Sequence, residues 1–287
     1  MTVSVLPRSL AHPGVDPPSL VDRARAALGW QGSDFLVGLQ GYDELMATLA
    51  VAADVEGLVR VPDPASPPVR LLRALAAPAS AAVGLRVSRV AAVPAPWRWT
   101  RVGGGSAEIA GVALRQQTYA DVVETMGRAG VSFRVVPDRA TTDELVALGR
   151  DLGSAVLDAG EVDDETLVVP GWLDELGPVG YGLISRDGGL GTSETTDDMV
   201  WLSLRARQET AGTLVVALEQ VAAMGIDLDF LHSDPHAASA HSGRHDFYVG
   251  FVAPGARVHA LREALTGVGF SSRVLAAFAP PAADAGP

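Results

Sequence analysis

The chain has 287 residues, 48% of them apolar, and a formal net charge of −12, which suits one large or two to three small domains and argues against nucleic acid as a partner. Cysteine is absent, and all 22 basic residues are arginine, so lysine is absent as well. This composition excludes thiol nucleophiles, disulfides, iron–sulfur clusters, cysteine-based zinc sites and Schiff-base chemistry, including internal attachment of pyridoxal phosphate.

The first 190 residues alternate between strand-like and helix-like stretches, which predicts an α/β fold. A proline-rich stretch at 6–18 is predicted to be a loop. The expected strands of a first lobe lie at 3–6, 34–39, 57–62 and 86–93, and the expected helices at 19–28, 42–55 and 69–77.

A second α/β lobe is predicted after a crossover at 94–106 that is rich in proline, tryptophan and glycine. Trp97 and Trp99 have strand spacing there, so their rings either form the floor of a ring-binding pocket or pack at a lobe junction. The expected strands are 108–114, 133–136 and 155–157, and the expected helices are 119–129 and 142–152. Strands expected at 166–170 and 181–185 return the chain to the first lobe.

The remainder of the chain has the most regular pattern. Val200, Leu202 and Leu204 alternate at strand spacing, and apolar residues then recur at helical spacing up to Gly225, which stands where a helix-ending glycine is expected. Two further strands, a second helix and a last strand follow. The order β-α-β-β-α-β predicts a ferredoxin-like unit.

Three segments of this unit resemble the ACT regulatory domain that ends prephenate dehydratases: AGTLVVALEQVAAMGIDLDFLHSDP, HDFYVGF and SSRVLAAFAP. Earlier stretches, such as YDELMATLAVAADVEGLVRVPDPAS and RVVPDRATTDELVALGRDLGSAVLDAGEV, resemble the catalytic lobes of the same family. The resemblance implies an α/β fold with a two-lobed periplasmic-binding-protein-like domain, a ferredoxin-like ACT domain and a homodimer or homotetramer. The implied boundaries are 1–188 for the two lobes (second lobe about 94–160), 189–197 for a linker, 198–280 for the ACT-like domain and 281–287 for a disordered tail.

The family's catalytic motifs are altered. Where the family has Thr-Arg-Phe, with a threonine thought to assist loss of the hydroxyl and an arginine that binds substrate, this chain has Val179, Gly180 and Tyr181. Valine cannot donate a proton and glycine cannot hold a carboxylate, so an ordinary dehydratase is not expected. The family's Val-Pro-Ile-Glu-Asn-Ser corresponds to residues 61–66 and its Ser-His-Pro-Gln to residues 114–117.

A site for a cyclic dicarboxylic acid still needs a proton donor and cationic groups for the carboxylates. Without lysine, anions must be held by arginine, backbone N–H groups or hydroxyls. Arg115 beside Gln116 and Gln117 is predicted to form an anion-binding corner, although any of these arginines could instead be solvated surface. The candidate catalytic residues are Ser66, Thr118 and Tyr181, and the candidate substrate-binding residues are Arg8, Arg98, Arg115, Gln116 and Gln117.

The effector motif is altered as well. The family's Glu-Ser-Arg-Pro becomes His232, Ser233, Asp234 and Pro235, which replaces an arginine by an aspartate and weakens the case for phenylalanine regulation. Histidines and carboxylates between 232 and 246 could bind a metal, but their spacing favours a polar solvent loop. The candidate effector-binding residues are Gly212, Thr213, Leu214, His232, Ser233 and Asp234. No metal or other cofactor is expected.

No apolar run approaches the length of a membrane helix, and the first residues do not resemble a secretion signal, so we expect a cytoplasmic protein without a membrane partner. Three functional hypotheses are open. The first is a specialised lyase that dehydrates or decarboxylates prephenate or a related cyclic acid in aromatic amino acid-related or secondary metabolism. Relatives that decarboxylate prephenate without aromatising it also lack parts of the dehydratase motif. The second is a true dehydratase, and the third is a non-catalytic sensor of a small acid.

Overall fold

The computed structural model describes residues 9–13, 16, 18–32, 36–95, 97–102, 109–158, 160–161, 178–186, 196–235 and 245–280. Contacts divide the chain into two units, the first formed by Met1–Gly14, Leu28–Ala91 and Gly180–Pro287, and the second by Val15–Ala27 and Ala92–Val179. No helix among the described residues is long and apolar enough to cross a membrane. The expected strands at 3–6 and 166–170 lie outside the described residues.

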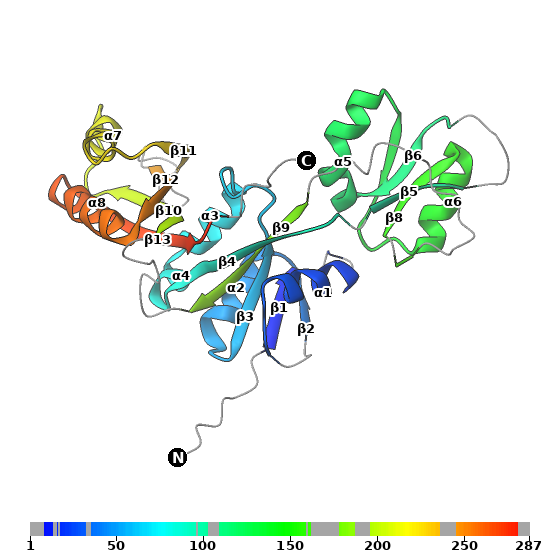
Figure 1. The fold of residues 1–287 in the computed structure, drawn as a ribbon, viewed down its shortest axis with the longest axis horizontal. Helices are drawn as coiled ribbons and strands as arrows, with labels where there is room; N and C mark the ends of the chain where they lie inside the picture. Colours follow the sequence, from blue (N-terminus) through cyan, green and yellow to red (C-terminus); the bar gives the residue numbers. More distant parts are fainter. Residues whose placement is uncertain are drawn as a thin grey trace, which may run out of the picture. The chain divides into compact units, whose positions relative to one another are not determined.

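The first unit is built on one nine-stranded sheet (Figure 1). Its strands are β1 (Ser9–Pro13), β2 (Leu36–Leu39), β3 (Val55–Arg60), β4 (Leu85–Val93), β9 (Val179–Arg186), β10 (Asp197–Ala206), β11 (Leu228–Pro235), β12 (His245–Pro254) and β13 (Phe270–Phe278). They are ordered β11-β12-β10-β13-β4-β9-β3-β1-β2. The helices of this unit are α2 (Tyr42–Val51), α3 (Val69–Ala76), α4 (Pro78–Ala82), α7 (Thr213–Ala223) and α8 (Gly255–Gly267).

The proline-rich stretch that we predicted to be a loop contains strand β1, so this prediction was wrong. β1 pairs in parallel with β2 on one side and with β3 on the other, and its Leu10 and Ala11 are fully buried. Two neighbouring strands satisfy the backbone groups, and the burial outweighs the local turn preference. Pro13 is the last residue of the strand, where a missing N–H costs little.

The C-terminal segment, residues 197–278, follows the predicted order β10-α7-β11-β12-α8-β13. Its four strands are antiparallel, with β10 between β12 and β13 and with β11 at the edge, which is the ferredoxin-like arrangement. β13 then pairs in parallel with β4 of the first lobe, Ala276 opposite Val87. The β13–β4 pair joins the strands of the C-terminal segment and those of the first lobe into one continuous sheet.

The two faces of β10 pack against different partners because side chains alternate along a strand. Val200, Leu202 and Leu204 join a core with Val221 of α7 and Leu261 of α8. Met199 and Trp201 on the other face join a second core, which is shared with the helices of the first lobe. That second core includes Met199, Trp201, Tyr248 and Phe278 together with Leu71, Leu72 and Leu75 of α3.

The second unit carries a four-stranded sheet in the order β5-β8-β6-β7, whose strands are β5 (Trp97–Arg101), β6 (Val112–Arg115), β7 (Phe133–Val136) and β8 (Ser154–Asp158). Its helices are α1 (Pro18–Ala27), α5 (Gln116–Ala129) and α6 (Thr142–Leu152). The ranges predicted for α6 and β7 are confirmed. Thr141 caps α6 by accepting the backbone N–H of Glu144, whose carboxylate accepts the N–H of Thr141 in return.

The crossover predicted at 94–106 contains strand β5, which the composition of this segment did not predict. β5 pairs antiparallel with β8, and the buried Trp97 and Trp99 lie on it. Trp97 donates its indole N–H to Asp121 of α5 at 2.9 Å. These contacts favour the packing interpretation of the two tryptophans over a ring-binding floor.

Two glycine-to-alanine substitutions test the packing of the C-terminal sheet. A Cβ at Gly250 of β12 would lie 2.0 Å from the ring of Phe230, which itself is buried. We expect Gly250→Ala to lower the free energy of unfolding by about 1–3 kcal/mol, because the ring must move within a packed core. A Cβ at Gly267 in α8 meets nothing within 4 Å, so Gly267→Ala should be neutral or stabilising. Urea unfolding of both variants checks this, and equal effects would contradict the packing described.

Candidate functional site

The altered motif at 179–181 lies where β9 begins beside the end of β3. Tyr181 is opposite Arg60 in the antiparallel pair, and the N–H of Val61 donates to the carbonyl of Gly180 at 2.8 Å. A Cβ at Gly180 would lie only 2.0 Å from the carbonyl oxygen of Val61. The backbone position therefore admits no side chain. An arginine, which the resemblance places here in prephenate dehydratases, requires the two strands to separate.

The three predicted catalytic hydroxyls differ in exposure. Ser66 is exposed in a turn that Asp63 organises, because the Asp63 carboxylate accepts the N–H of Ala65 at 2.8 Å and its carbonyl accepts the N–H of Ser66 at 3.0 Å. Tyr181 is fully buried, with the guanidinium of Arg60 5.8 Å from its ring centroid. Thr118 is buried in the first turn of α5. Ser66 alone of the three hydroxyl residues is on the surface.

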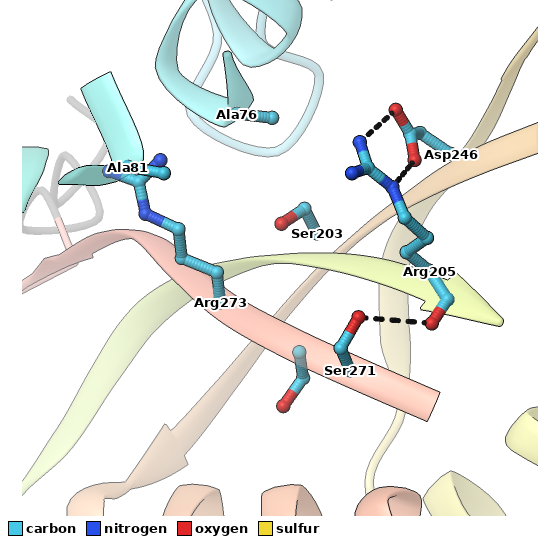
Figure 2. A pocket seen from close by; sticks show the side chains of 8 residues that line it. Ala76, Ala81, Ser203, Arg205, Asp246, Ser271 and Arg273 are labelled. Atoms are coloured by element: carbon cyan, nitrogen blue, oxygen red, sulfur yellow. Dashed lines mark hydrogen bonds and ion pairs between the residues drawn. The ribbon is translucent and has the colours of Figure 1, made fainter. Parts of the chain in front are cut away.

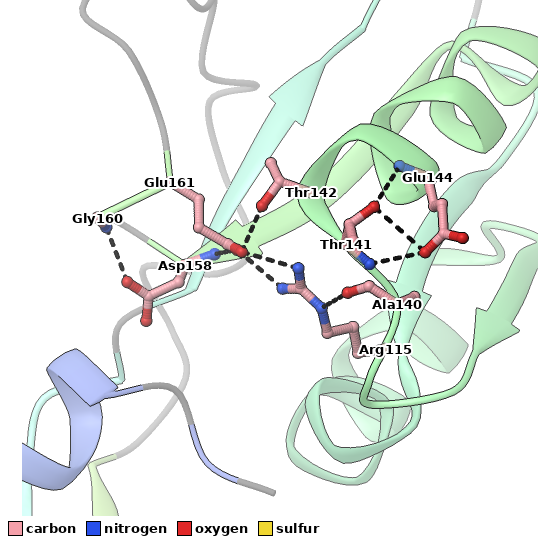
Figure 3. A network of polar contacts seen from close by, with 8 residues as sticks. All are labelled: Arg115, Ala140, Thr141, Thr142, Glu144, Asp158, Gly160 and Glu161. Atoms are coloured by element: carbon pink, nitrogen blue, oxygen red, sulfur yellow. Dashed lines mark hydrogen bonds and ion pairs between the residues drawn. The ribbon is translucent and has the colours of Figure 1, made fainter.

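Arg115, the predicted anion-binding residue, already binds a carboxylate of the protein (Figure 3). Its two terminal nitrogens donate to the two oxygens of Glu161 at 2.8 and 2.7 Å, and its Nε donates to the carbonyl of Ala140 at 3.1 Å. The side chain of Arg115 is 12% exposed. A bound anion can use these donors only by displacing Glu161. The role of Arg115 in an anion-binding corner stays a prediction, with the carboxylate of Glu161 as its partner in this structure.

Glu161 is held from several directions. Thr142 at the start of α6 donates its hydroxyl at 2.6 Å, and the N–H of Asp158 at the end of β8 donates at 3.0 Å. Burial by itself raises the pKa of a carboxyl group, but the hydrogen bonds from Arg115, Thr142 and Asp158 together hold the pKa of Glu161 below its usual value. The carboxylate thus joins β6, β8 and α6. Sequence reasoning missed it because 46 residues separate it from Arg115.

Two of the other predicted substrate-binding residues are exposed in the described structure. Arg98 is exposed on β5, and Gln116 is exposed at the start of α5. Arg8 and the side chain of Gln117 lie outside the described parts. Of the two predicted cations of the second unit, Arg98 is therefore exposed and Arg115 is paired internally.

The predicted effector residues of β11 are partly engaged by the first lobe. Arg73 of α3 donates to both carboxylate oxygens of Asp234 at 2.7 and 2.6 Å, and this partner raises the pKa of Arg73. Asp234 is buried, whereas the side chain of Arg73 is 58% exposed. His232 is half-buried against the ring of Phe230, at a centroid distance of 5.2 Å, and Ser233 is exposed.

The predicted effector residues before α7 form a local turn. Gly212 precedes the helix with a φ of 86°, a conformation that favours glycine. The hydroxyl of Thr213 accepts the N–H of Thr210 at 2.8 Å and donates to its carbonyl at 2.8 Å. Leu214 packs against the core between the sheet and its helices. The backbone and hydroxyl of this loop therefore organise the start of the helix.

A pH-dependent contribution to stability is expected from Glu161. Its folded-state pKa lies below the unfolded value of about 4.3, so its ionised form stabilises the fold above that pH, and this contribution is lost as the pH falls through the folded-state pKa. Glu161→Gln should lower the free energy of unfolding at pH 7 by about 1–3 kcal/mol. The difference in free energy of unfolding between Glu161→Gln and the unmodified chain should shrink below about pH 4. Urea unfolding midpoints at several pH values measure this difference.

Glu263→Gln is the matched control for this prediction. Glu263 is 72% exposed and pairs with His259 one helical turn away, so its neutralisation should leave the urea midpoint nearly unchanged. A deficit for Glu161→Gln that is the same at pH 3 and pH 7 would contradict the assigned role of the ionised carboxylate.

The sequence matches no protein-family model and no curated protein. Solved structures do match. The prephenate dehydratase of Arthrobacter aurescens, in complex with L-Phe, aligns with a TM-score of 0.68 and 17% identity over 95% of this chain and 90% of that one. The prephenate dehydratase of Staphylococcus aureus aligns with a TM-score of 0.65 and 12% identity over 94% and 99%.

A third structure, GqqA, described as a novel type of quorum quenching acylase, aligns with a TM-score of 0.63 and 16% identity over 96% of this chain and 99% of that one. The alignments run through nearly the whole length of each chain, so they include both lobes and the C-terminal segment. The chain therefore has the prephenate dehydratase fold, in a sequence that has diverged far from those of the matched structures.

Proposed function

We propose that the chain is a lyase that acts on prephenate or a related cyclic carboxylic acid, in aromatic amino acid-related or secondary metabolism. The shared fold supports this proposal, together with the sequence resemblance in both lobes and in the C-terminal segment. In this proposal residues 1–188 form the catalytic domain and residues 198–280 an ACT domain. The fold by itself does not select the chemistry, since an acylase shares it.

The loss of a hydroxyl group at position 179 is the observation that favours one reaction over the other. Dehydration of prephenate removes the ring hydroxyl and carbon dioxide together, and it needs a proton donor at the hydroxyl. Val179 stands where the resemblance places the threonine, and its side chain supplies no such donor. The 2.0 Å approach of a Cβ at Gly180 to Val61 leaves no room for the arginine. Decarboxylation alone keeps the hydroxyl. The bond to the ring carboxylate breaks, its electron pair moves into the ring, and a ring carbon takes up a proton.

Exposed groups are the best candidates for contacting the substrate. We assign Ser66 as the hydroxyl group that contacts the reacting ring and Arg98 as a carboxylate ligand, with Arg8, Gln116 and Gln117 as further polar partners. Thr118 and Tyr181, the other two predicted catalytic residues, are buried. Arg115 contributes a positive potential that Glu161 partly neutralises.

Incubation with prephenate near neutral pH, followed by NMR over time, tests this proposal. We expect a dihydro product with the ring hydroxyl retained. Arg98→Met should lower kcat/KM by at least about tenfold, since hydrogen bonds to charged groups contribute about 1.5–3 kcal/mol. Arg257→Met removes an exposed arginine from α8 and should leave the rate unchanged. Formation of phenylpyruvate, abolished in Ser66→Ala, would contradict the decarboxylase assignment.

A sensor function is the second candidate, because the internal pair of Arg115 and Glu161 leaves fewer cations for a substrate. Prephenate that stays unchanged beyond the buffer control would favour this candidate. Calorimetric titration with aromatic amino acids and keto acids then identifies a bound acid. Binding without turnover, lost in Arg98→Met and kept in Arg257→Met, would establish the sensor.

We also propose a homo-oligomer that forms through the edge of the C-terminal segment. Among the described strands, β11 pairs with β12 alone, so its outer edge is open. Apolar side chains are exposed beside that edge, with Leu231 of β11 at 40% and Val215 of α7 at 56%. A second copy of the chain covers both the open backbone groups and the apolar surface.

Light scattering coupled to gel filtration checks this interface. The chain should elute as a dimer or tetramer, and the double variant Leu231→Glu with Val215→Glu should shift towards the monomer, because charges would be buried at the contact. Val51→Glu is the control, since Val51 is 84% exposed on α2 of the first lobe. A monomeric unmodified chain at tens of micromolar would reject the proposal.

A further inference from the structure

The face of the C-terminal sheet that packs against the first lobe changes from apolar to polar along its strands. Trp201 belongs to the apolar part, and the next residues on the same face of β10 are Ser203 and Arg205. Their cross-strand neighbours are polar as well. One row of the sheet contains Asp246, Arg205 and Ser271, and the adjacent row contains Tyr248, Ser203 and Arg273.

These rows border a pocket of about 150 Å³ (Figure 2). Ala76 of α3 and Ala81 of α4 line its opposite side. Ser203 lies between Arg205 and Arg273 in this view. None of the predicted substrate-binding, catalytic or effector-binding residues lines the pocket, so it is separate from both candidate sites discussed above.

Arg205 offers an unused donor to this pocket. Its Nε and one terminal nitrogen donate to the two carboxylate oxygens of Asp246 at 2.6 and 2.8 Å. The other terminal nitrogen makes no hydrogen bond to any residue that the structure describes. The same holds for the hydroxyl of Ser203, whereas the hydroxyl of Ser271 donates to the backbone carbonyl of Arg205 at 3.2 Å. A guanidinium N–H and a serine hydroxyl thus remain to bind a ligand.

Arg273 adds a positive charge that no described carboxylate neutralises. Its guanidinium donates to the backbone carbonyls of Leu75, Ser80 and Leu85, the last two at 2.9 and 2.8 Å. Burial lowers the pKa of Arg273, because the charged form loses water without gaining an anion. An anion in the pocket would supply the missing opposite charge. With one carboxylate for two guanidinium groups, the lining has a net positive charge.

We propose that this pocket binds a small oxyanion, held by the free N–H of Arg205, the hydroxyl of Ser203 and the charge of Arg273. Inorganic phosphate and short carboxylates such as pyruvate are small enough for a pocket of about 150 Å³ and carry the required negative charge. The ligand would link strands β10 and β13 to helices α3 and α4 of the first lobe.

Calorimetric titration of the full chain with sodium phosphate, sodium pyruvate and sodium acetate, at constant ionic strength, tests the proposal. We expect saturable binding of at least one of these anions, and a higher thermal midpoint in its presence. Preference among the probes distinguishes a phosphate ligand from a carboxylate ligand. Arg205→Met should weaken binding by at least tenfold, while Arg257→Met, which removes the same charge from the exposed surface of α8, should bind like the unmodified chain.

Ser203→Ala provides a second variant, because Arg205→Met also leaves Asp246 without its partner. It should weaken binding while the thermal midpoint without ligand stays nearly constant, since this hydroxyl makes no hydrogen bond within the described structure. Equal affinity in the unmodified chain, Arg205→Met and Ser203→Ala would overturn the proposal. Absence of binding by the folded chain up to tens of millimolar of every probe would overturn it as well.

Discussion

The packing of one face of the C-terminal sheet against helix α3 is the interaction on which the rest of the first unit depends. Trp201 is fully buried at its centre, edge-on to the ring of Phe278 at a centroid distance of 5.6 Å. Its indole N–H donates to the carbonyl of Pro64 at 3.0 Å. Pro64 belongs to the turn that carries Ser66, so a tryptophan of the C-terminal segment positions a candidate catalytic residue. Any movement of this sheet against α3 therefore reaches that turn directly.

Arginine side chains connect several elements of this chain, which contains no lysine. Arg186 donates to the carbonyl of Leu49 near the end of α2, and Arg273 donates to that of Leu75 near the end of α3, where the helix dipole favours a positive charge. Arg73 and Arg115 form two-bond pairs with carboxylates. The fixed fork of the guanidinium suits such bridges between elements. Consequently, an arginine of this chain indicates a ligand only where one of its donors is left over, as at Arg205.

The sequence predicted elements well wherever local pattern and tertiary context agree. The range of α6 follows from its capping box and apolar spacing, and the C-terminal order follows from clear alternation and helical periods. β1 and β5 were missed because proline, tryptophan and glycine dominate their surroundings, whereas pairing with neighbouring strands decides their conformation. The ion pair between Arg115 and Glu161 could not be predicted from the sequence either, because only the folded sheet brings the two residues together.

Gly180 shows how strand pairing constrains the chemistry of this site. Its replacement of the family's arginine is visible in the sequence, but the reason for it is not. The carbonyl of Gly180 accepts the N–H of Val61, and the carbonyl of Val61 occupies the space of a Cβ at position 180. Glycine here is a requirement of the β3–β9 pairing. An arginine at this position would disrupt the sheet unless the two strands separated, so the backbone itself limits which side chains this position can carry.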